Sequence, residues 1–375
     1  MLRRSVSVLS SKSFEYAAVT KKRRIKSWQL HEYGGIDELQ LGSIRLPVIR
    51  DPNEVLVQVN AASVNPIDLL MIGGYGRNLF QIQRNFENEL PLTVGRDFAG
   101  TIIAKGHKVR DGMKVGDEVY GFIPLHKQGT FSEVILANAC HVLPIPKQLS
   151  SIESTSLVYA TMTAWSALFI FGNLVSKQTD GLRVLILGCS GGVGTAAVQL
   201  LKSQDCVVFG TCSSDAVSLV YNLGADCVFD YTSPDFHKNV ELEGRYHIIL
   251  DAAQIGYQNI PKSWKYDTYI TLNSPLLKST DSYGLMAGLA YSASDLLDAN
   301  LRAYKDSSCV KWGFFIPSTR GFEFVDDLIS KEKIKPVIHK TFGFGKLQDA
   351  FKTVSEGHLR GKVVIDFSID NDCNE

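Results

Sequence analysis

Four glycines in one short stretch of the chain have the spacing of a loop that binds an anion. Residues 184–200 read VLILGCSGGVGTAAVQL, in which an apolar run leads into the glycines and a small-residue helix follows. Gly188 permits a tight turn, Gly191 and Gly192 let a ligand touch the backbone, and Gly194 lets the helix pack close to the strand. The free N–H groups of that helix would then face an anion. This context favours the pyrophosphate of a dinucleotide over a purely structural turn.

The end of the next strand indicates which dinucleotide binds. In NAD-binding proteins a carboxylate about 20 residues after the glycines holds the ribose hydroxyls. Here the sequence is GTCSSDA, so Ser213 and Ser214 occupy the contact position and Asp215 lies just beyond it. A hydroxyl accepts a 2′-phosphate that a carboxylate would repel, so the pattern favours NADPH, although the two serines could simply cap a helix. The next helix supplies no Lys or Arg; a cation would come from elsewhere, with Arg360 as the candidate, and Tyr231 could add a hydroxyl.

The segments around the glycines alternate between strands and helices. Strands are expected at residues 207–212, 226–231, 246–253 and 268–273, with helical stretches between several of them. This alternation predicts an α/β fold with a parallel, doubly wound sheet.

The first and last parts of the chain have a different pattern. Residues 28–146 contain short apolar runs broken by Gly, Pro and Asp, which is typical of a mostly β, barrel-like domain. A helix follows from Ser150, with Ser150 or Ser151 as its N-cap and Glu153 as the capping-box partner. Residues 321–367 alternate helix and strand and are expected to rejoin the first domain. The nucleotide domain would then be an insertion.

The N-terminus has the composition of a mitochondrial transit peptide. MLRRSVSVLSSKSF contains three basic residues and five serines, and the first carboxylate is Glu15. The other interpretation is a disordered tail of a cytosolic protein.

Composition excludes several classes of function. Lys+Arg and Asp+Glu are both 39, which argues against a nucleic-acid-binding surface. No apolar run has the length of about 18–20 residues that a transmembrane span needs. The seven cysteines form no C-x-x-C pair, so neither a disulfide framework nor a zinc site is expected. The apolar residues 285–301 are interpreted first as core, ahead of a dimer face or a membrane-contacting patch.

Several motifs together resemble the medium-chain dehydrogenase/reductase family, in its zinc-free quinone oxidoreductase branch. The resemblance covers nearly the whole chain after about residue 25. The motifs are AASVNPIDLLMIGGY, LPLTVGRDFAGTI, VGDEVYGF, TMTAWSAL, LGCSGGVG, LGADCVFDY and GKVVIDF. Zinc-dependent relatives place a cysteine where this chain has Asn65 and a Gly-His-Glu where it has Gly95-Arg96-Asp97, so no metal site is expected. The chain also departs from the family, with Cys189 for a common alanine and Gln254 for a glycine.

The resemblance implies a fold and a division of the chain. We expect a GroES-like β-barrel catalytic domain and a doubly wound Rossmann NADPH-binding domain. The boundaries are a leader at 1–24, catalytic residues 25–155, nucleotide-binding residues 156–318 and a return segment at 319–375. The residues expected to bind the cofactor are Gly188, Ser190, Gly191, Gly192, Val193, Gly194, Ser213, Ser214, Tyr231, Phe314, Phe315, His358, Leu359 and Arg360.

Three residues are candidates for catalysis under this resemblance. Asn65 could donate a hydrogen bond to the carbonyl of the acceptor, or it could be only a turn residue before Pro66. Thr163 matches a family threonine near the nicotinamide, or it bonds its own helix. Tyr75 could touch the substrate or donate a proton, or it packs in its loop.

The expected function is NADPH-dependent hydride transfer to a quinone or another conjugated carbonyl in mitochondria, in the matrix or at the inner membrane. One alternative is an enoyl-thioester reductase of the same fold. Another is a non-catalytic NADPH-binding sensor or scaffold. The resemblance also leaves room for a reticulon-type or other mitochondrial protein partner and for a homodimer.

Overall fold

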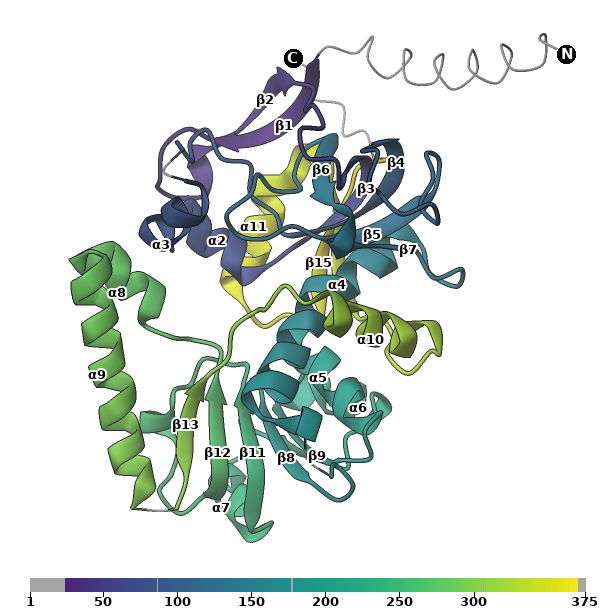
Figure 1. Cartoon of the computed structure of the whole chain (residues 1–375). Coiled ribbons are helices and arrows are strands. Elements are labelled where there is room, and N and C mark those ends of the chain that lie inside the picture. The colour runs from purple at the N-terminus through teal and green to yellow at the C-terminus, as the bar shows by residue number, and fades with distance from the viewer. Residues whose placement is uncertain (1–23, 86, 177, 306, 370–375) are drawn as a thin grey trace, which may run out of the picture.

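The chain folds into two parts, each built on its own β-sheet, and Figure 1 shows one part above the other. The computed structural model describes residues 24–85, 87–176, 178–305 and 307–369. The expected leader lies outside these residues apart from Arg24, where β1 begins.

The lower part is a six-stranded sheet in the order β10-β9-β8-β11-β12-β13, and every neighbouring pair is parallel. Its strands are β8 (Arg183–Leu187), β9 (Val207–Cys212), β10 (Cys227–Asp230), β11 (Arg245–Asp251), β12 (Lys265–Thr271) and β13 (Cys309–Trp312). The prediction of a parallel, doubly wound sheet is confirmed. Because the strand order changes direction between β8 and β11, the crevice for a ligand lies beyond the carboxyl ends of these strands. The four glycines follow β8 at this position.

Alternate side chains of β8 are buried on opposite faces of this sheet. Val184 and Ile186 belong to one apolar cluster, and Leu185 and Leu187 belong to another. Helices α5 and α6 contribute to the first cluster, and α7 and α9 contribute to the second. The bounds are α5 (Gly192–Lys202), α6 (Val217–Asn222), α7 (Phe236–Leu242) and α9 (Leu285–Tyr304). Burial on both faces explains why the strand is continuously apolar in sequence.

The upper part is a mostly antiparallel sheet in the order β14-β15-β3-β4-β5-β7, with β6 paired to β3. Its strands are β3 (Glu54–Val64), β4 (Asp97–Lys105), β5 (Glu118–Phe122), β6 (Val134–Asn138), β7 (Val142–Pro144), β14 (Ile338–Gly343) and β15 (Lys362–Asp366). The strands β1 (Arg24–Leu30) and β2 (Leu39–Arg45) pair with each other, and the helices of this part are α2 (Pro66–Ile72), α3 (Arg77–Gln83) and α11 (Leu347–Glu356). Since β15 pairs with β3, the return segment belongs to the same sheet as the first part of the chain.

Helix α4 (Ser151–Trp165) lies between the two sheets and contacts both parts. It begins at Ser150, whose side chain and that of Glu153 form the expected capping box. The apolar cluster around it includes side chains of β5 and β8 and of α10 (Thr319–Ser330). The expected boundary between residues 155 and 156 falls inside this helix. With the π-helical turn after it, residues 151–171 are long and apolar enough to span a membrane, yet 83% of that window is buried in the protein.

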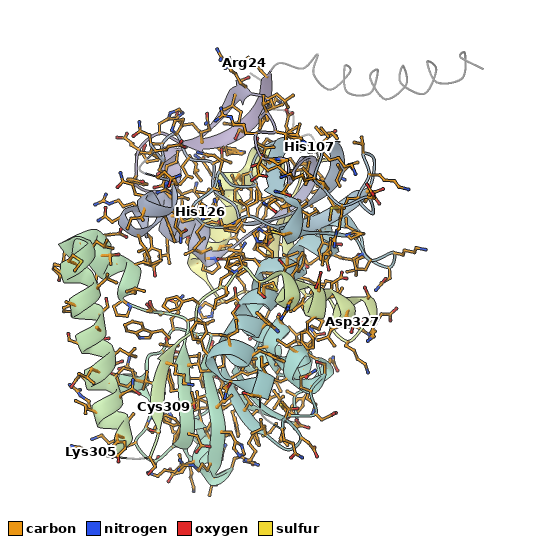
Figure 2. The ribbon with its side chains drawn as sticks, viewed as in Figure 1. Arg24, His107, His126, Lys305, Cys309 and Asp327 are labelled. Carbon is orange, nitrogen blue, oxygen red and sulfur yellow. The ribbon has the colours of Figure 1, made fainter. Side chains whose placement is uncertain are left out.

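A hairpin of α8 (Leu276–Tyr283) and α9 stands beside the parallel sheet. One face of α9 is buried through Gly288, Ser292, Ala299 and Ala303. The opposite face exposes apolar side chains, among them Met286 (79%), Leu297 (61%) and Tyr304 (81%). The interpretation of residues 285–301 as core is therefore wrong for the outer face of α9. Lys305, which follows the end of this helix, is labelled in Figure 2. Small residues occupy the inner face, so the larger apolar side chains are left outside.

The close approach of α5 to β8 makes Gly194 and Gly191 differ in their tolerance of a side chain. A Cβ at Gly194 would overlap the carbonyl oxygen of Gly188 and lie 2.6 Å from the Cα of Cys189. A Cβ at Gly191 would meet its nearest atom, the same carbonyl oxygen, at 3.7 Å, and its φ of −77° suits any residue. Gly194→Ala is therefore expected to lower the free energy of unfolding by about 1–3 kcal/mol, and Gly191→Ala by less than about 0.5 kcal/mol. Urea unfolding of both variants measures the difference, and equal stabilities would contradict the packing described here.

Candidate active site

Asn65 lies between the end of β3 and the start of α2, and it is 2% exposed. Pro66 occupies the first helical position, where its missing N–H is not needed. The backbone N–H of Asn65 donates to the carboxylate of Asp68 over 2.9 Å. The residue is thus held at a helix start, as the turn interpretation expects, while its amide side chain faces other groups.

The ammonium of Lys362 determines which way the Asn65 amide points. Lys362 begins β15, and its Nζ donates to the carbonyl of Val64 at 2.9 Å and to Oδ1 of Asn65 at 2.5 Å. Since Oδ1 must face the ammonium, Nδ2 faces the other way. It donates to Oδ2 of Asp97 at 3.2 Å and to the carbonyl of Ser63 at 3.3 Å.

Four buried charged groups surround this amide. Asp97 accepts hydrogen bonds from the backbone N–H and the hydroxyl of Ser63, and Asp68 lies 3.6 Å from Nε of Arg96. Burial lowers the pKa of Lys362 and raises the pKa of Asp97. Burial also raises the pKa of Asp68, to about 6, against the opposing effect of Arg96. Removing one member would leave an uncompensated charge, so the cluster can only be stable as a whole.

The same return segment touches the glycine-rich turn. The N–H of Gly361 donates to the carbonyl of Ser190 at 2.9 Å, and a Cβ on Gly192 would lie 2.7 Å from Cδ of Lys362. Gly188 has a φ of +81°, which a glycine adopts without strain. A Cβ at Gly191 would meet no atom closer than 3.7 Å, and α5 begins directly after it with its unpaired N–H groups. This turn therefore fits the pyrophosphate of a dinucleotide.

Arg360 extends from the return segment to the end of β9. Its Nη2 donates to the hydroxyl of Ser213 at 2.7 Å and to the carboxylate of Asp215 at 2.7 and 2.8 Å. The backbone N–H of Tyr231 donates to the carbonyl of Cys212, which places Tyr231 beside this corner with its side chain exposed. Ser214 is exposed next to it. The structure thus brings the guanidinium of Arg360, the expected cation, to the hydroxyl of Ser213.

Three other expected residues, Thr163, Phe314 and Phe315, make contacts within α4 or with aromatic side chains. Thr163 donates its hydroxyl proton to the carbonyl of Tyr159, one turn back in α4, as the backbone-bonding alternative expects. Phe315 stacks on Tyr159 with ring centroids 4.2 Å apart, and Phe314 packs edge-on against Phe171 at 5.9 Å. Phe315 packs against the apolar core around α4, and Phe314 is half-buried.

The remaining expected residues lie at the turn before β15 and at the α2–α3 junction. His358 is exposed with a φ of +52°, whereas Leu359 packs against the barrel core, as Val193 packs against the other core. Tyr75 lies beside a contact between the two parts, where the carboxylate of Asp281 in α8 accepts from the N–H groups of Gly76 and Asn78. Burial, and then Asp281, raise the pKa of Tyr75, so its hydroxyl stays protonated.

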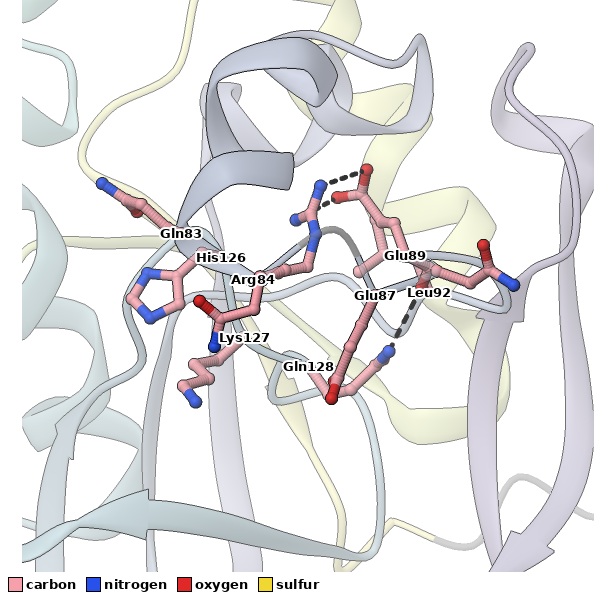
Figure 3. A pocket seen from close by; sticks show the side chains of 10 residues that line it. Gln83, Arg84, Glu87, Glu89, Leu92, His126, Lys127 and Gln128 are labelled. Carbon is pink, nitrogen blue, oxygen red and sulfur yellow. Dashed lines mark hydrogen bonds and ion pairs between the residues drawn. The ribbon is translucent and has the colours of Figure 1, made fainter.

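A cavity of about 300 Å³ lies at the end of α3 and is separate from this cluster (Figure 3). Its charged groups are partly matched, since Arg84 pairs with Glu89 at 2.8 Å. None of the residues expected to bind the cofactor line it. The lining residues are Gln83, Arg84, Asn85, Glu87, Asn88, Glu89, Leu92, His126, Lys127 and Gln128.

Two members of the cluster were missed by sequence reasoning. Asp97 was considered only as part of a missing zinc motif, and Lys362 was not considered at all. A lysine directly after a glycine in the apolar strand GKVVIDF is a signal, because a buried lysine requires a partner. Over the described part of the chain, no group of three or more His, Cys, Asp or Glu side chains could hold a metal ion.

Comparison with known proteins identifies the family of the chain. Residues 51–147 match the alcohol dehydrogenase GroES-like domain, and residues 223–365 match the zinc-binding dehydrogenase family. The chain is 41% identical to NAD(P)H oxidoreductase RTN4IP1, mitochondrial, of Drosophila melanogaster, over 91% of this chain and 86% of that protein. It is 31% identical to reticulon-4-interacting protein 1, mitochondrial, of Caenorhabditis elegans, over 93% of this chain and 96% of that protein.

A solved structure shows the same fold. The quinone oxidoreductase from Coxiella burnetii superposes with a TM-score of 0.72 at 24% identity, over 92% of this chain and 99% of that one. The two matched domains, the identity to the insect relative and the similar fold of this structure all indicate the same family. The chain belongs to the medium-chain dehydrogenase/reductase family of oxidoreductases.

Proposed function

We propose that this chain is an NADPH-dependent, zinc-independent oxidoreductase that transfers a hydride to a quinone or another conjugated carbonyl in mitochondria. The name of the similar insect protein, an NAD(P)H oxidoreductase marked as mitochondrial, supports the reaction class and the compartment. The transit-like leader read from the sequence agrees with that compartment.

One observation carries the proposal. Gly361 and Lys362 are neighbours in the return segment, and they contact Ser190 and Gly192 of the glycine-rich turn on one side and Asn65 on the other. A dinucleotide bound along the turn would therefore extend towards Asn65. This juxtaposition of a cofactor cradle and a buried polar cluster is what a hydride-transfer site needs.

The protein's part in the reaction is orientation and charge stabilisation. When bound, the nicotinamide supplies the hydride. The longer of the two hydrogen bonds of Asn65 Nδ2, at 3.3 Å to the Ser63 carbonyl, is the one that a substrate oxygen would replace. The ammonium of Lys362 polarises the amide from its oxygen side, which strengthens the N–H donor as negative charge develops on the substrate.

The groups at the end of β9 are proposed to select between NADPH and NADH. Ser213 and Arg360 offer a hydroxyl and a guanidinium at the place where a 2′-phosphate would lie. The exposed Tyr231 can contribute a third donor. These groups support NADPH as the cofactor.

The exposed face of α9 supports a protein contact. Its apolar side chains, including Met286, Leu297 and Tyr304, are unusual for a free surface when they gather on one helix. We propose a homodimer through this face. The alternative occupant is a reticulon-type or other mitochondrial protein, as the name of the nematode relative suggests.

The role of Asn65 can be tested with the purified full-length chain. NADPH oxidation by a short-chain quinone is expected to proceed, and Asn65→Ala is expected to lower kcat by about 100-fold, because the donor to the developing anion is lost. The dissociation constant of NADPH, measured by fluorescence titration, should change less than about 3-fold, since Asn65 does not belong to the glycine-rich turn.

Asn222→Ala, which alters an exposed asparagine at the end of α6, is the control and should retain full activity. Binding of NADPH without oxidation by quinones or enoyl thioesters would contradict the reductase and favour a sensor or scaffold. Equal kcat values for the Asn65 variant and the natural protein would exclude Asn65 as the donor.

The dimer can be tested by light scattering of the chain and of Leu297→Glu. A charge on the apolar face is expected to convert a dimer to a folded monomer, because Leu297 is exposed within one chain. Leu242→Glu, at a leucine that ends α7 and is more exposed than Leu297, should leave the dimer intact. A monomeric mass for the natural chain would contradict the proposal.

A further inference from the structure

The guanidinium of Arg360 is engaged on all of its nitrogens. Nη1 donates to the carbonyls of His358 and Leu359, at 3.0 and 3.1 Å. Nη2 donates to the hydroxyl of Ser213, and both Nε and Nη2 donate to the carboxylate of Asp215. Ser213 in turn donates its own proton to Asp215 over 2.6 Å. The carboxylate thus occupies both groups that were assigned to a 2′-phosphate.

Arg360 has partners other than Asp215. Two carbonyls of its own turn and the Ser213 oxygen also accept hydrogen bonds from the guanidinium. Asp215 is the more exposed partner, with a side chain 66% exposed against 24% for Arg360. The hydrogen bond from Ser213, followed by Arg360, lowers the pKa of Asp215, so the carboxylate is charged at neutral pH.

The carboxylate of Asp215 would have opposite effects on the binding of NADPH and of NADH. The 2′-phosphate of NADPH carries negative charge, so it competes with Asp215 for Arg360 and is repelled by it. The 2′-hydroxyl of NADH can instead donate a hydrogen bond to a carboxylate at this strand end. One residue therefore acts in opposite directions on the two cofactors.

We propose that Asp215 is a determinant of cofactor specificity, which reduces the preference for NADPH by competing with its 2′-phosphate for Arg360 and by accepting from the 2′-hydroxyl of NADH. This inference rests on the proposed binding of a nicotinamide dinucleotide at the glycine-rich turn. It adds that the NADPH preference created by Ser213 and Arg360 is partial, because a charged competitor is built into the same corner.

The test is a set of fluorescence titrations of the full-length chain with NADPH and with NADH at one fixed ionic strength. Asp215→Asn is expected to tighten NADPH binding by about 3- to 10-fold and to weaken NADH binding by about 2- to 5-fold. Arg360→Gln is expected to weaken NADPH binding by about 10-fold or more while NADH binding stays within about 2-fold.

The double variant distinguishes competition from simple repulsion. If Asp215 acts by competing for Arg360, Asp215→Asn should tighten NADPH binding much less when Arg360 is already glutamine. Asp327→Asn is the charge-matched control, since Asp327 lies exposed on α10 (Figure 2) and pairs with Lys331 just after the helix. It should change neither dissociation constant by more than about 2-fold.

Two outcomes would overturn this inference alone. Weaker NADPH binding by Asp215→Asn would mean that Asp215 orients Arg360 for the phosphate. An unchanged ratio of the two dissociation constants would mean that Asp215 takes no part in selection. If the natural chain bound neither cofactor, the proposed function would fail as well, so the two failures can be told apart.

Discussion

The buried ammonium of Lys362 is the interaction on which the arrangement of the site depends. It donates to the Asn65 amide and to the carbonyl of Val64, and its Cδ occupies the space beside Gly192 that a Cβ there would need. Its charge also offsets the carboxylates of Asp97 and Asp68. Without it the amide could rotate and two buried carboxylates would have Arg96 alone as a nearby cation. The site therefore depends on a residue to which the sequence analysis assigned no role, although it lies in the motif GKVVIDF.

The glycine-rich turn and the order of strands and helices could be predicted because their signals are local. A continuous apolar run, four glycines and a small-residue helix indicate their own conformation, and so does the capping box of Ser150 and Glu153. The cation for Ser213 could also be anticipated, since the following helix has none and Arg360 stands in the return segment. The first signals lie within single segments, whereas the cation was inferred from its absence in the helix after Ser213.

The charged cluster and the outer face of α9 could not be predicted in the same way. Lys362 and Asn65 are 297 positions apart, and their contact exists only because β15 pairs with β3. For α9, apolar composition suggested burial, yet the helix places its small residues inward and its larger apolar residues outward. Composition does not say which face of a helix meets the sheet. That depends on how closely the backbone must approach, which is a tertiary property.

Helix α4 limits how the two parts can move relative to each other. Its apolar cluster is shared by both sheets, so separating the parts along this side would expose a continuous core to water. On the opposite side the described contact between α3 and α8 includes the hydrogen bonds from Gly76 and Asn78 to Asp281, which water can replace. Separating the two parts is therefore less costly at the α3–α8 edge, where Asp281 and the carbonyl of Thr280 accept hydrogen bonds, than along α4.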